Sequence, residues 1–284
     1  MKFSLILATL GRTDELTRFL SSLDRQTFRD FELVVVDQNS DDRLVSLLAP
    51  YLSHITIRHL RSEPGLSRAR NVALAQVDGE IVAFPDDDCW YPDDLLESVV
   101  RFFDAHPEYE GLTGQCANDR GEPRGWWDSE PGRVTKINLF RRSGSVSMFF
   151  RRSAIARVGT FDETLGLGAD TPWQGCEDLD YVARAITAGV GLYYRPDLEV
   201  YHDDPPSLDS SLIMRAYRGA RATGRLLRIH QYPFWYVAYW SAGALGLSIF
   251  AVAKLDFKRA RYHWLSFLGR LEGWSAPIVS NPPA

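Results

Sequence analysis

The first third of the chain alternates short apolar runs with helical repeats, and this alternation constrains the fold more than any other feature. Apolar runs typical of strands occupy residues 3–8, 31–36, 55–60 and 81–84. Between them, apolar residues recur at helical spacing, as in 14–23 and 66–76. Strands that alternate with helices predict a parallel sheet flanked by helices. We therefore expect an α/β fold with a single Rossmann-like, mostly parallel sheet.

The pattern changes in the middle of the chain. A helix is predicted at 92–103, but between 111 and 142 glycine, proline, tryptophan and acidic residues mix without a period. A stretch of this length inside a compact domain is usually a functional loop. Regular patterns return with a strand at 146–150 and a helix around 179–186.

Polar residues follow the predicted strands at their carboxyl ends. Thr9 and Asp37 come directly after the first two apolar runs, and an acidic segment follows the run at 81–84. In open parallel sheets, ligands bind outside the carboxyl ends of the strands. We therefore expect these side chains to converge on one crevice.

The acidic segment consists of three consecutive carboxylates, Asp86, Asp87 and Asp88. Adjacent carboxylates repel one another unless a cation or hydrogen-bond donors neutralise them. Mg²⁺ or Mn²⁺, held by one or two carboxylates and by substrate phosphates, meets this requirement. The alternative is a solvated acidic turn that caps the next helix. His202, after a later strand-like run, is a candidate for a further metal ligand, although a single histidine is more often structural.

A second acidic group, Glu177, Asp178 and Asp180, begins the helix expected around 179–186. Asp178 and Asp180 cannot point in the same direction on a helix, so we expect them to have different roles. One carboxylate of this group could face the active site as a general base. The alternative is that the group only stabilises the helix N-terminus through the helix dipole.

Together these segments resemble the family 2 glycosyltransferases with the A-type fold. FSLILATLGR resembles the family's opening strand and Thr-x-x-Arg turn, VVVDQNSDD its VDDGSTD segment, and GLSRARNVA its G-x-x-x-A-R-N-x-G helix. FPDDDCWYP resembles the DxD segment, and GCEDLDYVARAITAG resembles the xED helix. Each segment alone is a weak signal, whereas their shared order and spacing are specific. The resemblance covers residues 3–202.

The resemblance implies a role for each matching residue. Asp178 would be the general base that takes the proton of the acceptor hydroxyl, and Glu177 would help to hold the acceptor or metal-bound groups. Asp88 and His202 would bind the divalent metal, Mn²⁺ or Mg²⁺. Six residues would bind the nucleotide sugar: Thr9, Arg12, Asp37, Arg70, Asp86 and Asp87.

The implied reaction is transfer of a sugar from a nucleotide-diphosphate donor to a hydroxyl, with inversion at the anomeric carbon. Trp173 and Gln174 lie where such enzymes often contact the donor or acceptor sugar, and a packing role for Trp173 is equally open. Gln38 and Asn39 replace the usual Asp-Gly, and Ala73 replaces the usual glycine. These departures leave the choice of nucleotide open, with a UDP-sugar favoured.

The C-terminal third has a different composition. Arginines recur mostly three or four residues apart at 215–228, which places them along one face of a helix. The segment 234–253 has no charge and is long enough to span a membrane, and basic residues follow it at 254–261. Basic residues on both sides conflict with a single span, so a segment lying in the cytoplasmic leaflet interface, or a re-entrant hairpin completed by 262–271, fits better. The alternative is a soluble helix that covers the catalytic domain or forms a dimer.

We therefore expect a catalytic domain at 1–206 and a helical, membrane-associating segment at 207–284. The net charge of −5 and the pI of about 5.7 give no general attraction to nucleic acid. Three cysteines without CxxC spacing argue against a disulfide framework and fit the cytoplasm. The expected location is the inner face of the plasma membrane, as a peripheral or monotopic protein. The expected partners are the sugar donor, a glycan or lipid-linked acceptor, and the membrane surface.

Two other enzyme classes on a similar sheet lack their sequence signatures. A nucleotidyltransferase would need a glycine-rich phosphate loop with lysine, and ATLGRTDEL has one glycine and no lysine. A dinucleotide oxidoreductase would need GxGxxG after the first strand. A non-catalytic module that binds sugar nucleotides or membranes stays open, because motif residues alone do not prove turnover.

Overall fold

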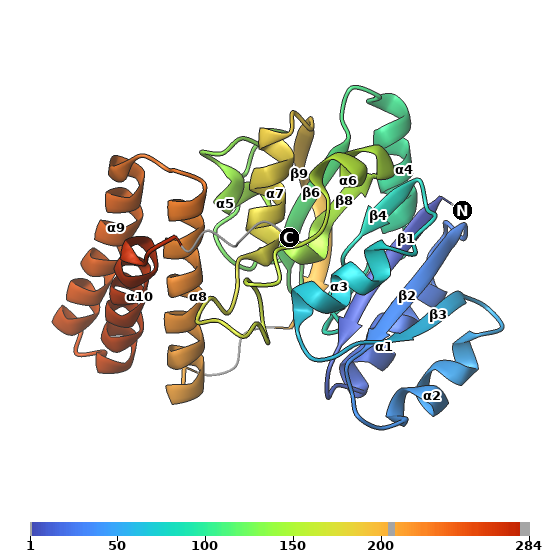
Figure 1. Cartoon of the computed structure of the whole chain (residues 1–284), viewed down its shortest axis with the longest axis horizontal. Helices are drawn as coiled ribbons and strands as arrows, with labels where there is room; N and C mark the ends of the chain where they lie inside the picture. Colours follow the sequence, from blue (N-terminus) through green and yellow to red (C-terminus); the bar gives the residue numbers. More distant parts are fainter. Residues whose placement is uncertain (1, 204–207, 279–284) are drawn as a thin grey trace. The chain divides into compact units, whose positions relative to one another are not determined.

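The computed structural model describes residues 2–203 and 208–278, and these contain nine strands that form one mixed sheet (Figure 1). The strands are β1 (Phe3–Thr9), β2 (Phe31–Asp37), β3 (Thr56–Arg61), β4 (Ile81–Ala83), β5 (Cys89–Trp90), β6 (Gly111–Ala117), β7 (Gly132–Arg133), β8 (Met148–Arg151) and β9 (Leu192–His202). Their order is β3-β2-β1-β4-β8-β6-β9-β5, with β7 also paired to β9. Strands β1 to β4 are parallel, whereas β8 runs antiparallel to β4 and β6. The predicted α/β class is confirmed, and its parallel part lies mainly in the N-terminal half.

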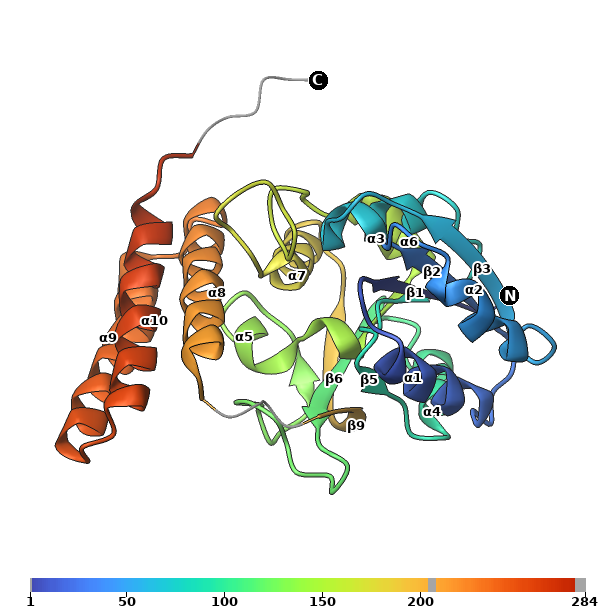
Figure 2. The ribbon, with the colours of Figure 1, turned by 90° about the horizontal axis from the view of Figure 1, so that it is seen from below.

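Helices cover both faces of the sheet. They are α1 (Asp14–Asp24), α2 (Arg43–Leu48), α3 (Leu66–Leu74), α4 (Leu95–Ala105), α5 (Leu139–Arg142), α6 (Arg152–Val158) and α7 (Glu177–Thr187), with short 3₁₀ turns η1 (Ala49–Tyr51) and η2 (Ser145–Ser147). Figure 2 shows α3 and α6 on one face and α1 and α4 on the other. Side chains alternate along a strand, so Phe3, Leu5 and Leu7 point together into the core that α1 and α4 complete.

The prediction of an irregular loop at 111–142 is wrong for its first part. Strand β6 lies inside the sheet, between β8 and β9. Its glycines are typical of loops, but here they allow β9 to approach closely. A Cβ atom on Gly114 would lie 2.0 Å from the carbonyl oxygen of Leu198, and one on Gly111 would lie 2.3 Å from a methyl carbon of Leu192. Beyond β6, the stretch contains only β7 and α5.

This packing predicts that Gly114→Ala lowers the free energy of unfolding by about 3 kcal/mol, because a backbone oxygen cannot rotate away from the new methyl group. Gly219→Ala is the matched control. It lies in the helix α8 (Ser210–Ile229), and no atom lies within 4 Å of the added Cβ. This control should be neutral or slightly stabilising. The urea midpoint measures both variants, and equal midpoints would contradict the close approach of β6 and β9.

The described residues group into two compact units. The first holds the chain up to Asp162 and the segment from Asp178 to the end of β9. The second holds Glu163–Glu177 and three C-terminal helices, α8, α9 (Phe234–Ala253) and α10 (Phe257–Ser275). The expected domain boundary at residue 206 lies outside the described residues and stays a prediction.

The three C-terminal helices pack on one another, with α10 against both α8 and α9. Glycines allow the contact between α8 and α10 to be close: a Cβ on Gly224 would lie 2.1 Å from the carbonyl oxygen of Arg270, and one on Gly273 would lie 1.9 Å from that of Arg221. Helix α9 covers the segment 234–253 that the sequence singles out. Within the part of the chain that the structure describes, it is the only helix whose length and composition would allow it to cross a membrane.

Candidate active site

The predicted polar residues of the first unit gather at one edge of the sheet. Thr9 ends β1, Asp37 ends β2, and the two are partners in the parallel ladder. Asp86 forms a bridge with Ala8 just beyond β4. His202 ends β9 and is paired with Cys89 of β5, which brings it beside the acidic segment. The expected convergence at this edge is therefore present in the structure.

Asp87 anchors the acidic segment to the loop after β1. Its Oδ2 accepts a hydrogen bond from Thr9 Oγ1 at 2.6 Å, and its Oδ1 accepts one from Arg12. Burial raises the pKa of Asp87, although the hydrogen bonds from Thr9 and Arg12 act in the opposite direction. Asp87 therefore holds Thr9 and Arg12 in place, and little of its surface remains for a ligand.

Asp88 lies between His202 and Arg12. Its Oδ1 is 3.2 Å from His202 Nε2, and its Oδ2 is 2.8 Å from Arg12 Nη2. Burial acts to raise the pKa of Asp88, but the contacts with His202 and Arg12 lower it below the usual value. The same hydrogen bond raises the pKa of His202. Arg124 Nη1 lies 2.5 Å from His202 Nδ1, so the other ring nitrogen is also engaged.

Ser145 connects Asp86 with Asp178. Its hydroxyl donates to Asp86 Oδ2 at 3.1 Å, and its backbone N–H donates to Asp178 Oδ2 at 3.1 Å. The buried side chain of Arg70 donates to the other oxygen of Asp86 at 3.0 Å. The first carboxylate of the acidic segment and the proposed base thus share one residue as a partner.

Asp178 has the electrostatic character of a general base. Burial raises its pKa, Asp86 adds to this effect, and the Leu179 backbone N–H, Arg70 and Ser145 oppose it. A raised pKa brings a carboxylate closer to the pH at which proton transfer is efficient. Asp180, two residues later, instead pairs with Arg184 at 2.8 Å on the same helix. The two aspartates point to different partners, as their spacing on α7 predicts.

Asp37 is fully buried, and protein groups engage both of its carboxylate oxygens. Oδ1 accepts hydrogen bonds from the backbone and side-chain nitrogens of Asn39 at 2.9 and 2.7 Å. Oδ2 lies 2.9 Å from His59 Nε2 and 3.2 Å from Arg61 Nη1. The structure thus places Asp37 at the expected edge of the sheet, but both of its carboxylate oxygens bind neighbouring protein groups.

The donors near Asp88 fit a divalent ion that binds together with a diphosphate. Within residues 2–203 and 208–278, no group of three or more histidine, cysteine, aspartate or glutamate side chains could hold a metal ion. Asp88 and His202 offer two ligands of types that Mn²⁺ accepts. A hard ion held by few protein ligands keeps its other positions for phosphates and water. Such binding requires Asp88 to exchange its contact with Arg12 or His202.

The remaining predicted residues belong to the second unit. Glu177 is buried at the first position of α7. Trp173 contacts two arginines of α8, with the guanidinium carbons of Arg221 and Arg225 at 5.6 and 5.3 Å from its ring centre. Gln174 donates to the carbonyl oxygens of its own loop. These contacts agree with the packing role that the sequence left open for Trp173.

Sequence reasoning missed Ser145 and Arg124. Ser145 lies in η2 before an antiparallel strand, so it reaches the site from the start of a strand rather than from its end. Arg124 lies in the aperiodic stretch after β6, where no spacing distinguishes one arginine from another. The sequence predicts a functional loop there, and the contact between Arg124 and His202 supports that prediction.

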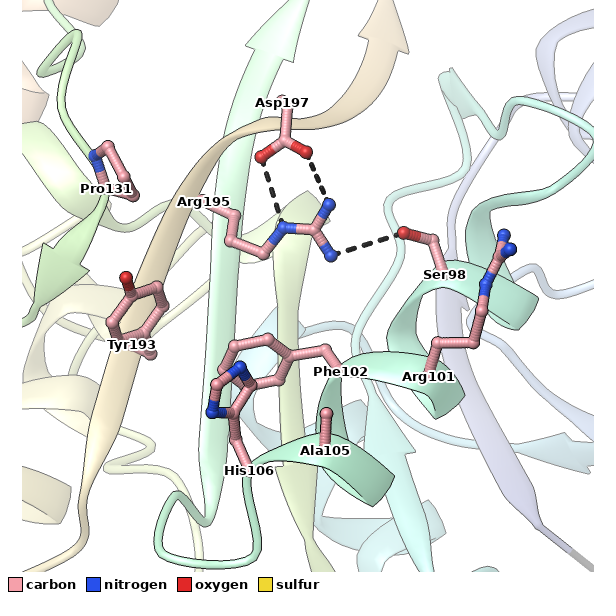
Figure 3. Close-up of a pocket in the computed structure, with 9 residues that line it drawn as sticks. All are labelled: Ser98, Arg101, Phe102, Ala105, His106, Pro131, Tyr193, Arg195 and Asp197. Atoms are coloured by element: carbon pink, nitrogen blue, oxygen red, sulfur yellow. Dashed lines mark hydrogen bonds and ion pairs between the residues drawn. The ribbon is translucent and has the colours of Figure 1, made fainter.

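A pocket of about 550 Å³ lies between α4 and the first half of β9, and none of the predicted site residues lines it (Figure 3). Phe102, His106 and Tyr193 form its aromatic wall. Arg195 turns toward Asp197 and Ser98, at 3.1 Å and 3.3 Å. Arg195 and Asp197 pair with each other, so their charges are already balanced within the pocket. We therefore do not count this pocket as part of the site around Asp86 and Asp88.

Comparison with known proteins identifies relatives of the N-terminal part of the chain. The model of the family described as Glycosyl transferase family 2 matches residues 4–165. Poly(ribitol-phosphate) beta-N-acetylglucosaminyltransferase TarS of Staphylococcus aureus is 32% identical over 144 residues, which cover 49% of this chain and 25% of that protein. The chain therefore spans about a quarter of the length of this relative.

Two solved structures share the fold over nearly the whole chain. Residues 1–349 of S. aureus TarS in complex with UDP-GlcNAc align with a TM-score of 0.59 and 20% identity, covering 94% of this chain and 92% of that one. A mannosyltransferase from Pyrobaculum calidifontis in complex with GDP-Man and Mn²⁺ aligns with a TM-score of 0.66 and 17% identity, covering 95% and 87%. At these identities the likeness shows the fold alone, and the predicted A-type fold is confirmed.

Proposed function

The chain belongs to glycosyl transferase family 2, and from this membership we propose that it is an inverting, metal-dependent glycosyltransferase. The donor is a nucleotide-diphosphate sugar, with a UDP-sugar favoured, and the acceptor is a hydroxyl of a glycan or a lipid-linked glycan. The product belongs to cell-surface polysaccharide or glycolipid biosynthesis. The UDP-GlcNAc complex of one relative supports a UDP donor, and the GDP-Man complex of another keeps GDP as the main alternative.

One observation carries this proposal: Ser145 contacts both Asp86, on the donor side, and Asp178, whose pKa is raised. A single displacement needs a base on one face of the sugar and a leaving group on the other. Asp178 takes the proton of the acceptor hydroxyl as its oxygen forms a bond to the anomeric carbon. The bond from that carbon to the diphosphate oxygen breaks on the opposite face, so the configuration inverts.

The donor-side residues bind and orient the nucleotide diphosphate. Arg12 and Arg70 supply positive charge among the carboxylates, and Thr9, Asp86 and Asp87 fix the edge of the sheet around them. Mn²⁺ or Mg²⁺ would be held by Asp88 and His202 and would offset negative charge on the departing diphosphate. Glu177 is proposed to support acceptor binding. Asp37 is proposed to act near the nucleobase of the donor, through the residues that enclose Asp37.

The composition of the C-terminal helices supports the proposed acceptor and location. A lipid-linked acceptor suits a chain whose second unit is basic and has one apolar helix. We place the protein at the cytoplasmic face of the plasma membrane, as a peripheral or monotopic enzyme. The lack of any global positive charge supports the absence of a nucleic-acid partner.

Calorimetric titration of UDP, GDP and dTDP, each with Mn²⁺ and again with EDTA, tests this function. Metal-dependent binding of one nucleotide is the expected result, and it would identify the base of the donor. The test uses the full chain without lipid, so that nucleotide binding is measured independently of the membrane. Binding of none of the three would reject the enzyme and favour a non-catalytic module that binds membranes.

A further inference from the structure

Helix α9 exposes most of its large apolar side chains on one face, and its buried residues are mainly small. Trp235, Tyr239, Ile249 and Phe250 are 60%, 69%, 63% and 62% exposed, and their spacing places them on one side of the helix. The buried residues are Tyr236 and Val237 near the start of the helix and four small residues further along: Ser241, Ala244, Ser248 and Ala251. A helix on the surface of a water-soluble domain has the reverse arrangement. The exposed stripe of α9 therefore needs an apolar environment outside this chain.

Helix α10 extends this surface and adds positive charge. Its exposed apolar residues lie on one face: Phe257, Trp264, Leu268 and Leu271. Exposed Lys258 and Arg261 lie beside or within that stripe. Residues 208–278 contain ten arginines and lysines against three aspartates and glutamates, in a chain whose net charge is −5. An apolar stripe with basic residues around it is complementary to a membrane with anionic head groups.

The packing of α9 on α10 decides how such a membrane would be bound. Ser248 Oγ donates to the carbonyl oxygen of Ala260 at 2.9 Å, and Arg270 donates to that of Trp240, so the two helices lie side by side (Figure 1). If α9 crossed the bilayer, α10 would run back beside it, and Arg261 and Arg270 would lie at the depth of the inner turns of α9, within hydrocarbon. Charged side chains are strongly disfavoured there. A helix that lies flat places its apolar stripe below the head groups and leaves the charges among them.

We propose that α9 and α10 bind flat in one leaflet of an anionic membrane, through the exposed stripe of α9, and do not cross it. This inference deepens the proposed function and rests on it only in linking the membrane to glycosyl transfer. The exposed side chains of α9 make the contact with lipid, and the helix neither spans nor re-enters the membrane. The aromatic residues near the start of α9, such as Trp235 and Tyr239, belong at the head-group level, where aromatic rings are enriched.

Flotation of the full chain with vesicles tests the proposal. Vesicles that contain phosphatidylglycerol should bind the protein more tightly than pure phosphatidylcholine, and salt should weaken that difference. The double variant Ile249→Glu/Phe250→Glu should lower the partition coefficient by roughly 100-fold, because each large apolar side chain contributes about tenfold. Val45→Glu/Leu52→Glu is the matched control. It makes the same change at exposed apolar positions of the first unit and should leave binding unchanged.

Three results would overturn the proposal. Unchanged vesicle binding by Ile249→Glu/Phe250→Glu would remove the stripe from the interface. Resistance of the bound protein to alkaline carbonate would show that α9 is inserted deeply and spans or re-enters the bilayer. Loss of a dimer in this variant, with no vesicle binding by the parent protein, would make the stripe an interface between two copies. Circular dichroism confirms folding, and the lipid-free nucleotide titration shows separately whether the proposed enzyme function stands.

Discussion

Asp178→Asn is expected to lower kcat by about 1,000-fold, while the affinity for the nucleotide diphosphate changes less than about threefold. The amide has nearly the same shape as the carboxylate, and its oxygen can still accept the hydrogen bond from the backbone N–H of Ser145. The geometry around Asp86 is therefore kept. The amide cannot accept the proton of the acceptor hydroxyl, so only the chemical step is affected. Initial rates of sugar transfer and calorimetric nucleotide titration measure the two effects.

Asp180→Asn provides the matched control, because it makes the same change on the same helix at a residue paired with Arg184. It should reduce stability slightly and leave kcat within a few-fold of the parent value. A comparable loss of activity in both variants would mean that α7 had been disturbed and that no catalytic role for Asp178 could be inferred. A large loss of nucleotide affinity in Asp178→Asn would also contradict the assigned role.

The pH dependence of the parent enzyme gives a second measure of the same residue. Because burial raises the pKa of Asp178, the carboxylate is protonated at a higher pH than an exposed aspartate. We expect kcat to fall as the pH decreases through this raised pKa. The effect on stability has the opposite sign: the folded state favours the protonated form, so this residue reduces stability as the pH rises from the usual aspartate pKa to the raised one.

Asp88→Ala is expected to weaken Mn²⁺-dependent nucleotide binding by roughly 100-fold. Asp88 is the carboxylate that faces His202, so its removal leaves a single protein ligand at that point. Affinity measured in EDTA should stay the same or increase, because Arg12 loses a competing carboxylate and becomes available to phosphate. Titration of the nucleotide with and without Mn²⁺ separates these contributions.

Asp93→Ala is a suitable control for this prediction. Asp93 lies five residues further along the chain and forms an exposed ion pair with Arg25 at 3.1 Å. Its removal should not alter metal dependence, because an exposed pair contributes little even to stability. An Asp88→Ala protein with undiminished Mn²⁺ dependence would exclude Asp88 from the metal site. Asp86, which accepts hydrogen bonds from Ser145 and Arg70, would then be the next candidate for the metal ligand.

The parallel half of the sheet was predictable because its strands are continuous apolar runs and its helices carry apolar residues at fixed spacing. The edge at which Thr9, Asp37 and Asp86 meet follows from the same pattern, since parallel strands end together. Strand β6 was not predictable. Its glycines are required because β9, about eighty residues further along the chain, packs closely against them. The sequence near β6 contains no signal of this contact.

The antiparallel strand β8 explains why part of the site was missed. Its register with β4 pairs Ala83 with Phe149, so the chain enters β8 at the edge where β4 ends. Residues that precede an antiparallel strand thus lie at the same edge of the sheet as residues that follow parallel strands. A search restricted to strand ends finds Asp86 and passes over Ser145. The enclosure of Asp37 by His59 and Arg61 was missed for a similar reason, because those residues alternate along β3 in a pattern that resembles an ordinary edge strand.

The shared position of Ser145 has a consequence for how enzymes of this kind can diverge. Its hydroxyl holds Asp86 and its backbone N–H holds Asp178. A substitution that removes the hydroxyl changes the donor side and leaves the backbone contact. A substitution or insertion that shifts the backbone alters both carboxylates at once. At this position, a side-chain change can therefore alter donor preference without loss of turnover. Insertions in this turn should be absent from active enzymes of this kind.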